Sequence, residues 1–208
     1  MIRILIADDH PIVRAGVKQI LEKKNCLYTL DEAQDAYEAK SKIVQVVYDV
    51  ILLDLTMPGT RGFDTLKEIK ALRPQTPVLV LSIHPEEQFG LRALKAGASG
   101  FVSKESAPRD LITAINRVSK GGKYLSAALT EKIADSINEQ EGLSHTKLSD
   151  REFDIFIQLA RGESIQNIAK TFNLSAKTVY THRERLMDKM KLTSTAQIIK
   201  YAIENNLV

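Results

Sequence analysis

Apolar and polar positions alternate in blocks along residues 1–125. Five short apolar runs are bounded by turn residues, at residues 2–7, 26–30, 50–53, 78–81 and 99–102. Amphipathic segments separate or follow them, at residues 10–23, 37–47, 63–72, 86–96 and 108–119. Short apolar runs are typical of buried strands, and apolar spacings of three and four are typical of helices. Five strands that alternate with five helices predict a parallel, doubly wound α/β sheet with right-handed crossovers.

The pattern changes after residue 145, where helical spacing continues without any strand-like run. Serines stand at the starts of the four short helices that this spacing predicts: Ser149, Ser164, Ser175 and Ser194. Glu152 and Gln197 follow the first and last of them by three residues, which predicts two capping boxes. Gly162 is expected to end the first helix. Short helices that include a pair joined by a tight turn, residues 172–175, favour a helix-turn-helix arrangement.

The third of these helices has two distinct faces. At about 100° per residue, its inner stripe consists of Val179, Leu186 and Met190, with His182 beside them. The opposite face is polar and carries Lys177, Thr181, Glu184 and Asp188, with Tyr180 and Arg185 on its flanks. A recognition helix, whose first turns contact base edges, has this pattern. So does an ordinary solvated amphipathic helix, and the spacing alone leaves both interpretations open.

Between the two patterned regions lies a predicted linker. Leu129, Ile133 and Ile137 recur every four residues, which predicts a short helix over residues 127–138. Residues 138–146 are polar with one glycine and are expected to form a flexible tether. We therefore divide the chain into residues 1–122, a linker at 123–145, and residues 146–208.

Composition narrows the class of protein without deciding it. The net charge of the chain is only +3, which is weak evidence for a nucleic-acid partner until the charge is located. Residues 146–208 carry ten Lys and Arg against seven Asp and Glu. The chain has a single cysteine, Cys26, so an intrachain disulfide is excluded, and this cysteine is expected to be buried. Because the sequence shows no signal-peptide pattern, we expect a soluble cytoplasmic protein. Neither a dinucleotide-binding nor a P-loop glycine motif is present.

Polar side chains stand where four of the five predicted strands end: Asp8, Asp9, Asp54, Ser82 and Lys104. The carboxyl ends of parallel strands meet at one edge of a sheet, where ligands of such folds bind. Three carboxylates held together need a cation, and their hard oxygen atoms suit Mg²⁺. An ammonium and a hydroxyl beside them could bind an added anion. This set predicts a site for a phosphoryl group on a carboxylate.

Each of these residues also has an ordinary structural interpretation. Asp54 could cap the next helix, and Asp8 or Asp9 could cap a helix that opens at Pro11. His10 and His84 lie beside the acids, but no second set of ligands at a usual spacing accompanies them, and we do not count them as metal ligands.

Taken together, these residues resemble the receiver domain of two-component response regulators. The resemblance rests on Asp8-Asp9, on Asp54 with Met57, Pro58 and Gly62, and on Ser82 and Lys104. The flanking words Ala-Asp-Asp-His-Pro at residues 7–11 and Lys-Ala-Gly-Ala-Ser-Gly-Phe at residues 95–101 are similar to the NarL/FixJ subfamily. The resemblance covers the whole first domain and implies a flavodoxin-like fold.

The resemblance also implies a role for each site residue. Asp54 would be the phosphoacceptor, with a phosphohistidine of a sensor histidine kinase as donor. Asp9, Asp54 and the backbone carbonyl of Thr56 would bind Mg²⁺ directly, and Asp8 partly through water. The remaining three positions would contact or sense the phosphoryl group: Lys104 as its ion-pair partner, Ser82 as the switch hydroxyl and Phe101 as the switch aromatic.

The last domain resembles the LuxR-type helix-turn-helix, through residues 148–152, 160–169 and 174–182. This resemblance implies a dimer on promoter DNA. The residues expected at the DNA are Lys177, Thr178, Tyr180, Thr181, His182, Arg183, Glu184 and Arg185. Among them, Tyr180, Thr181 and Glu184 would face bases, whereas the others would contact phosphates or pack. The residues expected at the dimer contact are Ile198, Ile199, Ala202 and Ile203.

We therefore expect a DNA-binding transcription regulator switched by phosphorylation of Asp54, and not an enzyme beyond its own phosphoryl transfer and dephosphorylation. Two alternatives remain. One is a phosphotransferase with an aspartyl-phosphate intermediate, which the sequence disfavours because Thr56 stands where such enzymes carry a second aspartate. The other is a DNA-binding regulator that acts without phosphorylation, which the intact Asp9, Asp54 and Lys104 disfavour.

Overall fold

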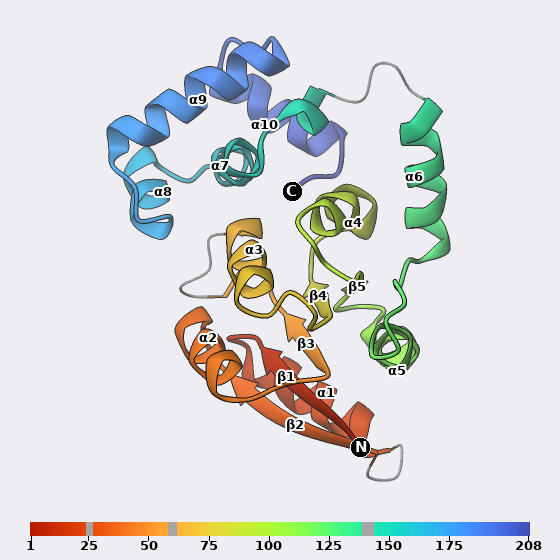
Figure 1. Ribbon diagram of the computed structural model, residues 1–208. Coiled ribbons are helices and arrows are strands. Elements are labelled where there is room, and N and C mark those ends of the chain that lie inside the picture. Colours follow the sequence, from red (N-terminus) through yellow and green to blue (C-terminus); the bar gives the residue numbers. More distant parts are fainter. Residues whose placement is uncertain (24–26, 58–61, 139–143) are drawn as a thin grey trace. The chain divides into compact units, whose positions relative to one another are not determined.

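The computed structural model describes residues 1–23, 27–57, 62–138 and 144–208 (Figure 1). Cys26, Pro58 and most of the predicted tether lie outside the described residues. Contacts divide the chain into two compact units, Met1–Lys132 and Ile133–Val208. The domain boundaries at residues 122 and 145 stay predictions. Within the described residues, no helix has both the length and the apolarity that crossing a membrane requires.

The first unit is a doubly wound α/β domain, as predicted. Its strands are β1 (Ile2–Ala7), β2 (Tyr28–Ala33), β3 (Val50–Leu53), β4 (Val78–Ser82) and β5 (Gly100–Ser103). They form one parallel sheet in the order β2-β1-β3-β4-β5. Its helices are α1 (Pro11–Glu22), α2 (Ala36–Gln45), α3 (Phe63–Leu72), α4 (Glu86–Lys95) and α5 (Ala107–Val118).

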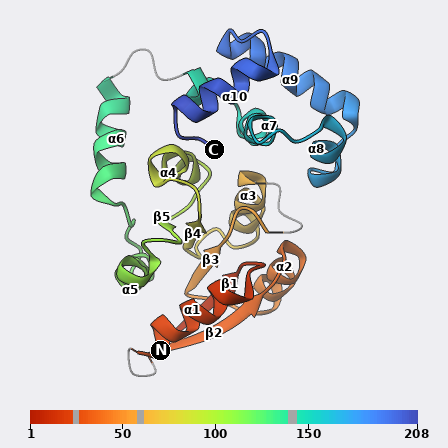
Figure 2. The ribbon, with the colours of Figure 1, turned by 180° about the vertical axis from the view of Figure 1, so that it is seen from behind.

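Helices cover both faces of this sheet. Figure 2 brings α1 to the front of the strands, and α1 packs beside α5, whereas α2 packs beside α3 and α3 beside α4. The residues of β3 and β4 are all buried. This double cover explains the continuous apolar runs, because a strand packed on both faces has no polar side.

The strand β2 differs from its prediction. We expected residues 26–30, but the strand covers Tyr28–Ala33 and includes Asp31 and Glu32. It is an edge strand that pairs only with β1, and most of its residues are half-buried. An apolar run is therefore a poor guide to its bounds.

A helix crosses the division between the two units. This helix, α6 (Ala127–Asn138), has the predicted bounds, and its residue Leu129 is fully buried. The end of the predicted tether is not irregular: Ser144–Lys147 form a short 3₁₀ helix, η1. The buried ring of His145 explains this difference, because its Nδ1 lies 2.9 Å from the hydroxyl of Tyr201.

The second unit contains the four predicted helices: α7 (Asp150–Ala160), α8 (Ile165–Thr171), α9 (Ala176–Met190) and α10 (Thr195–Glu204). The predicted serine caps all accept a backbone hydrogen bond from the first turn. Just beyond the helix ends, backbone with positive φ occurs at Gly162, Asn173, Lys191 and Asn206. Each helix thus has a local start signal and a local stop signal.

Only one of the two predicted capping boxes is reciprocal. Ser149 and Glu152 exchange both hydrogen bonds. At α10 the prediction is wrong in part: Ser194 accepts from the N–H of Gln197, but the Gln197 Oε1 accepts from the N–H of Thr193, at 2.6 Å. The glutamine reaches one residue further back than a capping box requires.

Candidate functional site

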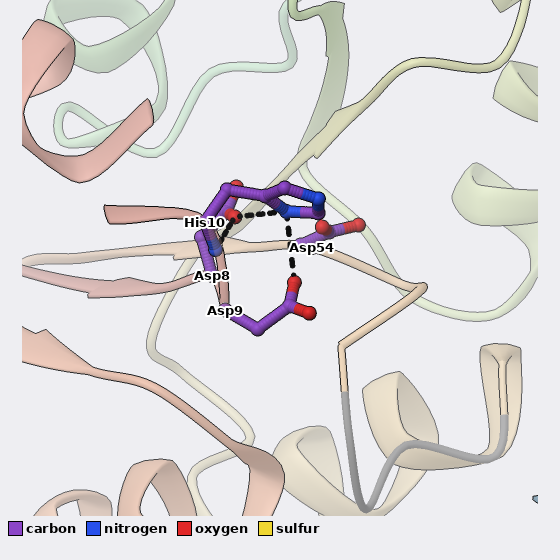
Figure 3. Close-up of side chains that lie close together, drawn as sticks. All are labelled: Asp8, Asp9, His10 and Asp54. Atoms are coloured by element: carbon purple, nitrogen blue, oxygen red, sulfur yellow. Dashed lines mark hydrogen bonds and ion pairs between the residues drawn. The ribbon is translucent and has the colours of Figure 1, made fainter. Parts of the chain in front are cut away.

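Three carboxylates meet at the carboxyl edge of the sheet. Asp8 and Asp54 follow the paired strands β1 and β3, and both are buried. The side chain of Asp9 is 31% exposed. One oxygen of each acid and a ring nitrogen of His10 all lie within 4.8 Å of one another (Figure 3). Carboxylates this close and this buried repel one another unless positive charge compensates them.

Lys104 supplies part of that charge. It follows β5, and its Nζ lies 2.8 Å from Asp8 Oδ2 and 2.7 Å from Asp54 Oδ2. Burial lowers the pKa of Lys104, but the hydrogen bonds to Asp54 and Asp8, together with the negative charges of these two acids, outweigh burial and raise this pKa above its ordinary value. The ammonium is therefore charged at neutral pH and bridges two buried acids.

Thr56 holds the other oxygen of Asp54. Its backbone N–H and its hydroxyl both donate to Asp54 Oδ1, at 2.9 and 2.8 Å. The resemblance implies a metal-binding role for the backbone carbonyl of Thr56, and an influence of this position on hydrolysis of the aspartyl phosphate. The hydroxyl contact depends on how the chain turns after β3, which the sequence pattern does not specify.

The two residues expected to respond to a phosphoryl group are both buried. Ser82 ends β4, and its Oγ accepts the N–H of His84 at 3.1 Å. Phe101 lies on the neighbouring strand β5 and is fully enclosed. The ring of His84 stacks on Phe89 of α4, with ring centroids 4.3 Å apart and planes 11° apart.

The ring of His10 lies beside the acids, as its place in the sequence suggests. Its Nδ1 is 2.9 Å from Asp9 Oδ1 and 3.1 Å from Asp8 Oδ1 (Figure 3). The interpretation of Asp8 or Asp9 as a helix cap is wrong, because His10 holds the N-cap position of α1 and Asp8 Oδ1 accepts the His10 N–H instead. Pro11 does occupy the first helical position, as predicted.

Arg14 accompanies the flanking motif at residues 7–11, but the sequence predicts no role for it in the site. Its Nη1 donates to the backbone carbonyl of Asp8 at 2.8 Å, and its Nε donates to Glu32 Oε2 at 2.8 Å. Through these two hydrogen bonds, Arg14 connects the loop that contains Asp8 with the edge strand β2. Arg14 lies one helical turn after Pro11, on the first turn of the helix that follows the acids. This spacing is the signal in the sequence that places its side chain near them.

The arrangement fits a divalent cation with hard oxygen ligands. Within the described part of the chain, Asp9 Oδ1 is a buried oxygen that accepts no hydrogen bond, although His10 lies beside it. Two further carboxylates approach the same point. Carboxylate and carbonyl oxygens are the ligands that Mg²⁺ prefers.

The helix α9 has the two faces that its sequence predicts. Val179, Leu186 and Met190 are buried, whereas Tyr180 is 52% exposed. Lys177, Glu184 and Arg185 are also exposed, and Thr178, Thr181, His182 and Arg183 are half-buried.

Some of the half-buried residues have structural contacts as well. The hydroxyl of Thr178 lies 2.8 Å from that of the cap residue Ser175, and Arg183 Nη2 donates to Thr195 Oγ1 at 3.1 Å. Burial lowers the pKa of His182 below its ordinary value. This last residue therefore favours its neutral form in the folded domain.

The four residues expected at a dimer contact do not share one face. Ile198 and Ala202 are fully buried in their own unit, so their assignment to a surface is corrected. Ile199 is half-buried and Ile203 is 60% exposed. Positions 198 and 202 form the inner stripe of α10, and only positions 199 and 203 extend the apolar surface outward.

A cluster of carboxylates at the edge of a doubly wound sheet, followed along the chain by a helix-turn-helix unit, indicates the class of signalling proteins in which a receiver precedes a DNA-binding domain. The sequence matches the family described as "Response regulator receiver domain" over residues 4–116. It also matches "Bacterial regulatory proteins, luxR family" over residues 146–202. The chain therefore belongs to the response regulators, in the NarL/FixJ subfamily, and is a two-component DNA-binding regulator.

Relatives of similar length support this assignment. Response regulator UvrY of Escherichia coli K12 is 31% identical over 209 residues, covering 100% of this chain and 96% of that protein. Oxygen regulatory protein NreC of Staphylococcus carnosus is 31% identical over 214 residues, covering 99% of both. A solved structure of RcsB from Salmonella enterica serovar Typhimurium, bound to promoter rprA in the presence of the phosphomimetic BeF₃⁻, has a TM-score of 0.74. It is 28% identical and covers 97% of this chain and 98% of that one.

Proposed function

We propose that Asp54 accepts a phosphoryl group from a phosphohistidine of a sensor histidine kinase. The observation that carries the proposal is the bridge from Lys104 to the buried carboxylates of Asp8 and Asp54. A carboxylate oxygen of Asp54 forms a bond to phosphorus as the nitrogen–phosphorus bond of the donor breaks. Little covalent chemistry is left to the protein, so positioning and charge neutralisation account for the catalysis.

The oxygen ligands for Mg²⁺ in this proposal are Asp9, Asp54 and the carbonyl of Thr56, with Asp8 partly through water. When bound, Mg²⁺ neutralises negative charge on the carboxylates and on the phosphoryl oxygens. Lys104 then exchanges part of its contact with Asp54 for a phosphoryl oxygen. The hydroxyl of Ser82 hydrogen-bonds another, and Phe101 repacks beside it.

We propose that the second unit reads promoter DNA through α9. Tyr180, Thr181 and Glu184 face bases, and Lys177 and Arg185 neutralise phosphates, which positions the domain without selecting sequence. Three further half-buried residues contribute at the edge of this surface: Thr178, His182 and Arg183. The solved RcsB complexes with promoter DNA support this use of the fold.

The active form in this proposal is a homodimer on DNA, in which Ile199 and Ile203 of α10 meet their counterparts. RcsB is described as dimers bound to DNA, and that observation belongs to RcsB. The exposure of Ile203 supports the same pairing for this chain. We place the protein in the cytoplasm, where a kinase and promoter DNA are both accessible.

Phosphorylation of the purified protein by a small phosphodonor tests the assignment of Asp54. The full chain is incubated with Mg²⁺ and acetyl phosphate, and intact mass is measured before and after. We expect one phosphoryl adduct, which Asp54→Asn abolishes and the exposed-site control Asp188→Asn retains. An adduct that survives Asp54→Asn would disprove the assignment. If wild type forms no adduct but still binds DNA specifically, the protein is a regulator that acts without phosphorylation.

A further inference from the structure

A glycine stands in the middle of α4, and a leucine of the linker helix fills the space beside it. A Cβ atom added to Gly90 would lie 2.8 and 3.0 Å from the two methyl carbons of Leu129. Leu129 is fully buried. Glycine inside a helix costs about 1 kcal/mol relative to alanine. The close approach of Leu129 gives a physical reason for accepting that cost at this position.

The first turn of α6 contacts α4 at a second point. Ser126 caps α6, because its Oγ accepts the N–H of Leu129 at 3.1 Å. The N–H of Ser126 itself donates to Glu86 Oε1, at 3.4 Å. Glu86 is the first residue of α4, so the two contacts to the linker lie one helical turn apart. Together they dock the start of α6 on α4.

Contacts also connect α4 to the phosphoryl site. Ser82 Oγ accepts the N–H of His84, and the ring of His84 stacks on Phe89. Phe89 directly precedes Gly90 in α4. The cap position of α4 is held by Pro85, whose side chain has no hydrogen-bonding group. An unbroken series of contacts therefore runs from the switch hydroxyl to the linker helix.

We propose that the contact between Gly90 and Leu129 transmits the state of the receiver to the linker. The inference rests on the proposed function. If Ser82 turns its hydroxyl to a phosphoryl oxygen, the hydrogen bond that its Oγ accepts from the N–H of His84 changes in geometry. The stacked rings of His84 and Phe89 then shift together with the start of α4. Gly90 shifts with this helix, and so the position against which Leu129 packs shifts as well. Because α6 continues past Lys132 into the second unit, this displacement reaches the output side of the chain.

Three variants isolate the contact. Gly90→Ala places a methyl group against Leu129, and also 3.2 Å from the Cγ of the more flexible Glu86 side chain. Because alanine favours the helix, the variant displaces the leucine without weakening α4. Leu129→Ala removes the partner, and the double variant makes room for the added methyl. Gly16→Ala is the matched control, because Gly16 also lies inside a helix and an added Cβ there would meet nothing within 4 Å.

Amide hydrogen exchange of the full chain measures the coupling, with Mg²⁺ and beryllofluoride as the phosphoryl probe. In wild type and Gly16→Ala, we expect beryllofluoride to change exchange at residues 82–86 and, by about tenfold, at residues 126–132. In Gly90→Ala and in Leu129→Ala, we expect residues 82–86 to respond while residues 126–132 do not. The double variant is expected to regain part of the response.

Two results would overturn the inference. One is a wild-type response at residues 82–86 with none at 126–132. The other is a full response at 126–132 in both single variants. If no residue of the receiver responds and acetyl phosphate leaves no adduct on Asp54, the proposed function fails and the inference falls with it. Leu129→Ala keeps the test decisive if Gly90→Ala does not fold.

Discussion

Thr56 donates two hydrogen bonds to a single oxygen of Asp54, one from its backbone and one from its hydroxyl. The other oxygen of the carboxylate contacts Lys104. Both oxygens are therefore fixed before any phosphodonor arrives, and Asp54 has one orientation relative to Asp8 and Asp9. A nucleophile held in this way needs little reorganisation to react.

The Thr56 hydroxyl is expected to contribute to the rate of phosphorylation. Thr56→Ala removes one of the two hydrogen bonds to Asp54. We expect phosphorylation by acetyl phosphate to slow about fivefold, which corresponds to the free energy of one such hydrogen bond. Thr56→Ser keeps the hydroxyl and should stay close to wild type. Rates from intact-mass time courses give the comparison. An increase in rate in Thr56→Ala would show that the hydroxyl restrains the nucleophile instead.

Lys104→Met should destabilise the receiver. It leaves two buried carboxylates without their shared ammonium, which we expect to lower the free energy of unfolding by about 3 kcal/mol. Added Mg²⁺ should recover part of this loss, since it supplies the missing charge. Urea unfolding measures both effects. Lys120→Met, at an exposed lysine just after α5, is the control and should change little.

The pair formed by Glu152 and Lys189 is expected to stabilise the second unit. Lys189 Nζ lies 2.6 Å from the buried Glu152 carboxylate, and this contact ties α9 to α7. Burial raises the pKa of Glu152, but the hydrogen bonds from Lys189 and Ser149, together with the charge of Lys189, outweigh burial and lower this pKa below its ordinary value. We expect Lys189→Met to cost about 2 kcal/mol in thermal or urea unfolding.

Lys200→Met provides the contrast. Lys200 and Glu204 are both exposed, and their charged groups lie 3.7 Å apart on α10. Loss of this ion pair should lower the free energy of unfolding by less than about 0.5 kcal/mol. Equal losses in the two variants would contradict a special role for the buried carboxylate.

His182 should make the second unit less stable in acid. Burial lowers its pKa in the folded state below the ordinary 6.5, so the unfolded chain binds the proton first as the pH falls. The stabilisation from neutral His182 is present above pH 6.5 and is lost as the pH falls toward the folded pKa. The test compares the free energy of unfolding of wild type and His182→Gln at several pH values from above 6.5 into the acid range. Parallel pH profiles would exclude the effect.

Two residues of α9 should affect DNA binding in different ways. Tyr180→Ala is expected to change which sequences are preferred, because the exposed side chain would face bases in the proposed complex. Lys177→Ala should weaken binding to all sequences about equally and reduce the salt dependence by about one unit of slope. Binding to a library of sites at several salt concentrations separates the effects. Equal, sequence-independent losses from both would disprove the division.

Much of the fold could be predicted because local and tertiary signals agree. β3 is apolar throughout and is buried on both faces, and Ser149 and Glu152 specify the start of α7 by themselves. The cluster of carboxylates could be predicted for the same reason, since parallel strands bring Asp8 and Asp54 to one edge. The remaining features depend on neighbours distant in sequence, which periodicity does not identify.

Three particular misses illustrate that dependence. β2 contains acids because it lies at an edge, and its bounds follow from pairing with β1 more than from hydrophobicity. Residues 144–147 are helical because His145 meets Tyr201, 56 residues away. Arg14 is part of the site through the carbonyl of Asp8, a contact that involves no pattern of side chains.

The serine caps and left-handed ends of the second unit have a consequence for how such proteins diversify. Between Ser175 and Lys191, the length and position of α9 are specified at its two ends and along its buried stripe. The outward positions, such as Tyr180 and Glu184, carry none of that information. They can be exchanged while the scaffold stays the same. In the proposed mode of DNA reading, a new DNA preference would therefore require only a few surface replacements and no redesign of the domain.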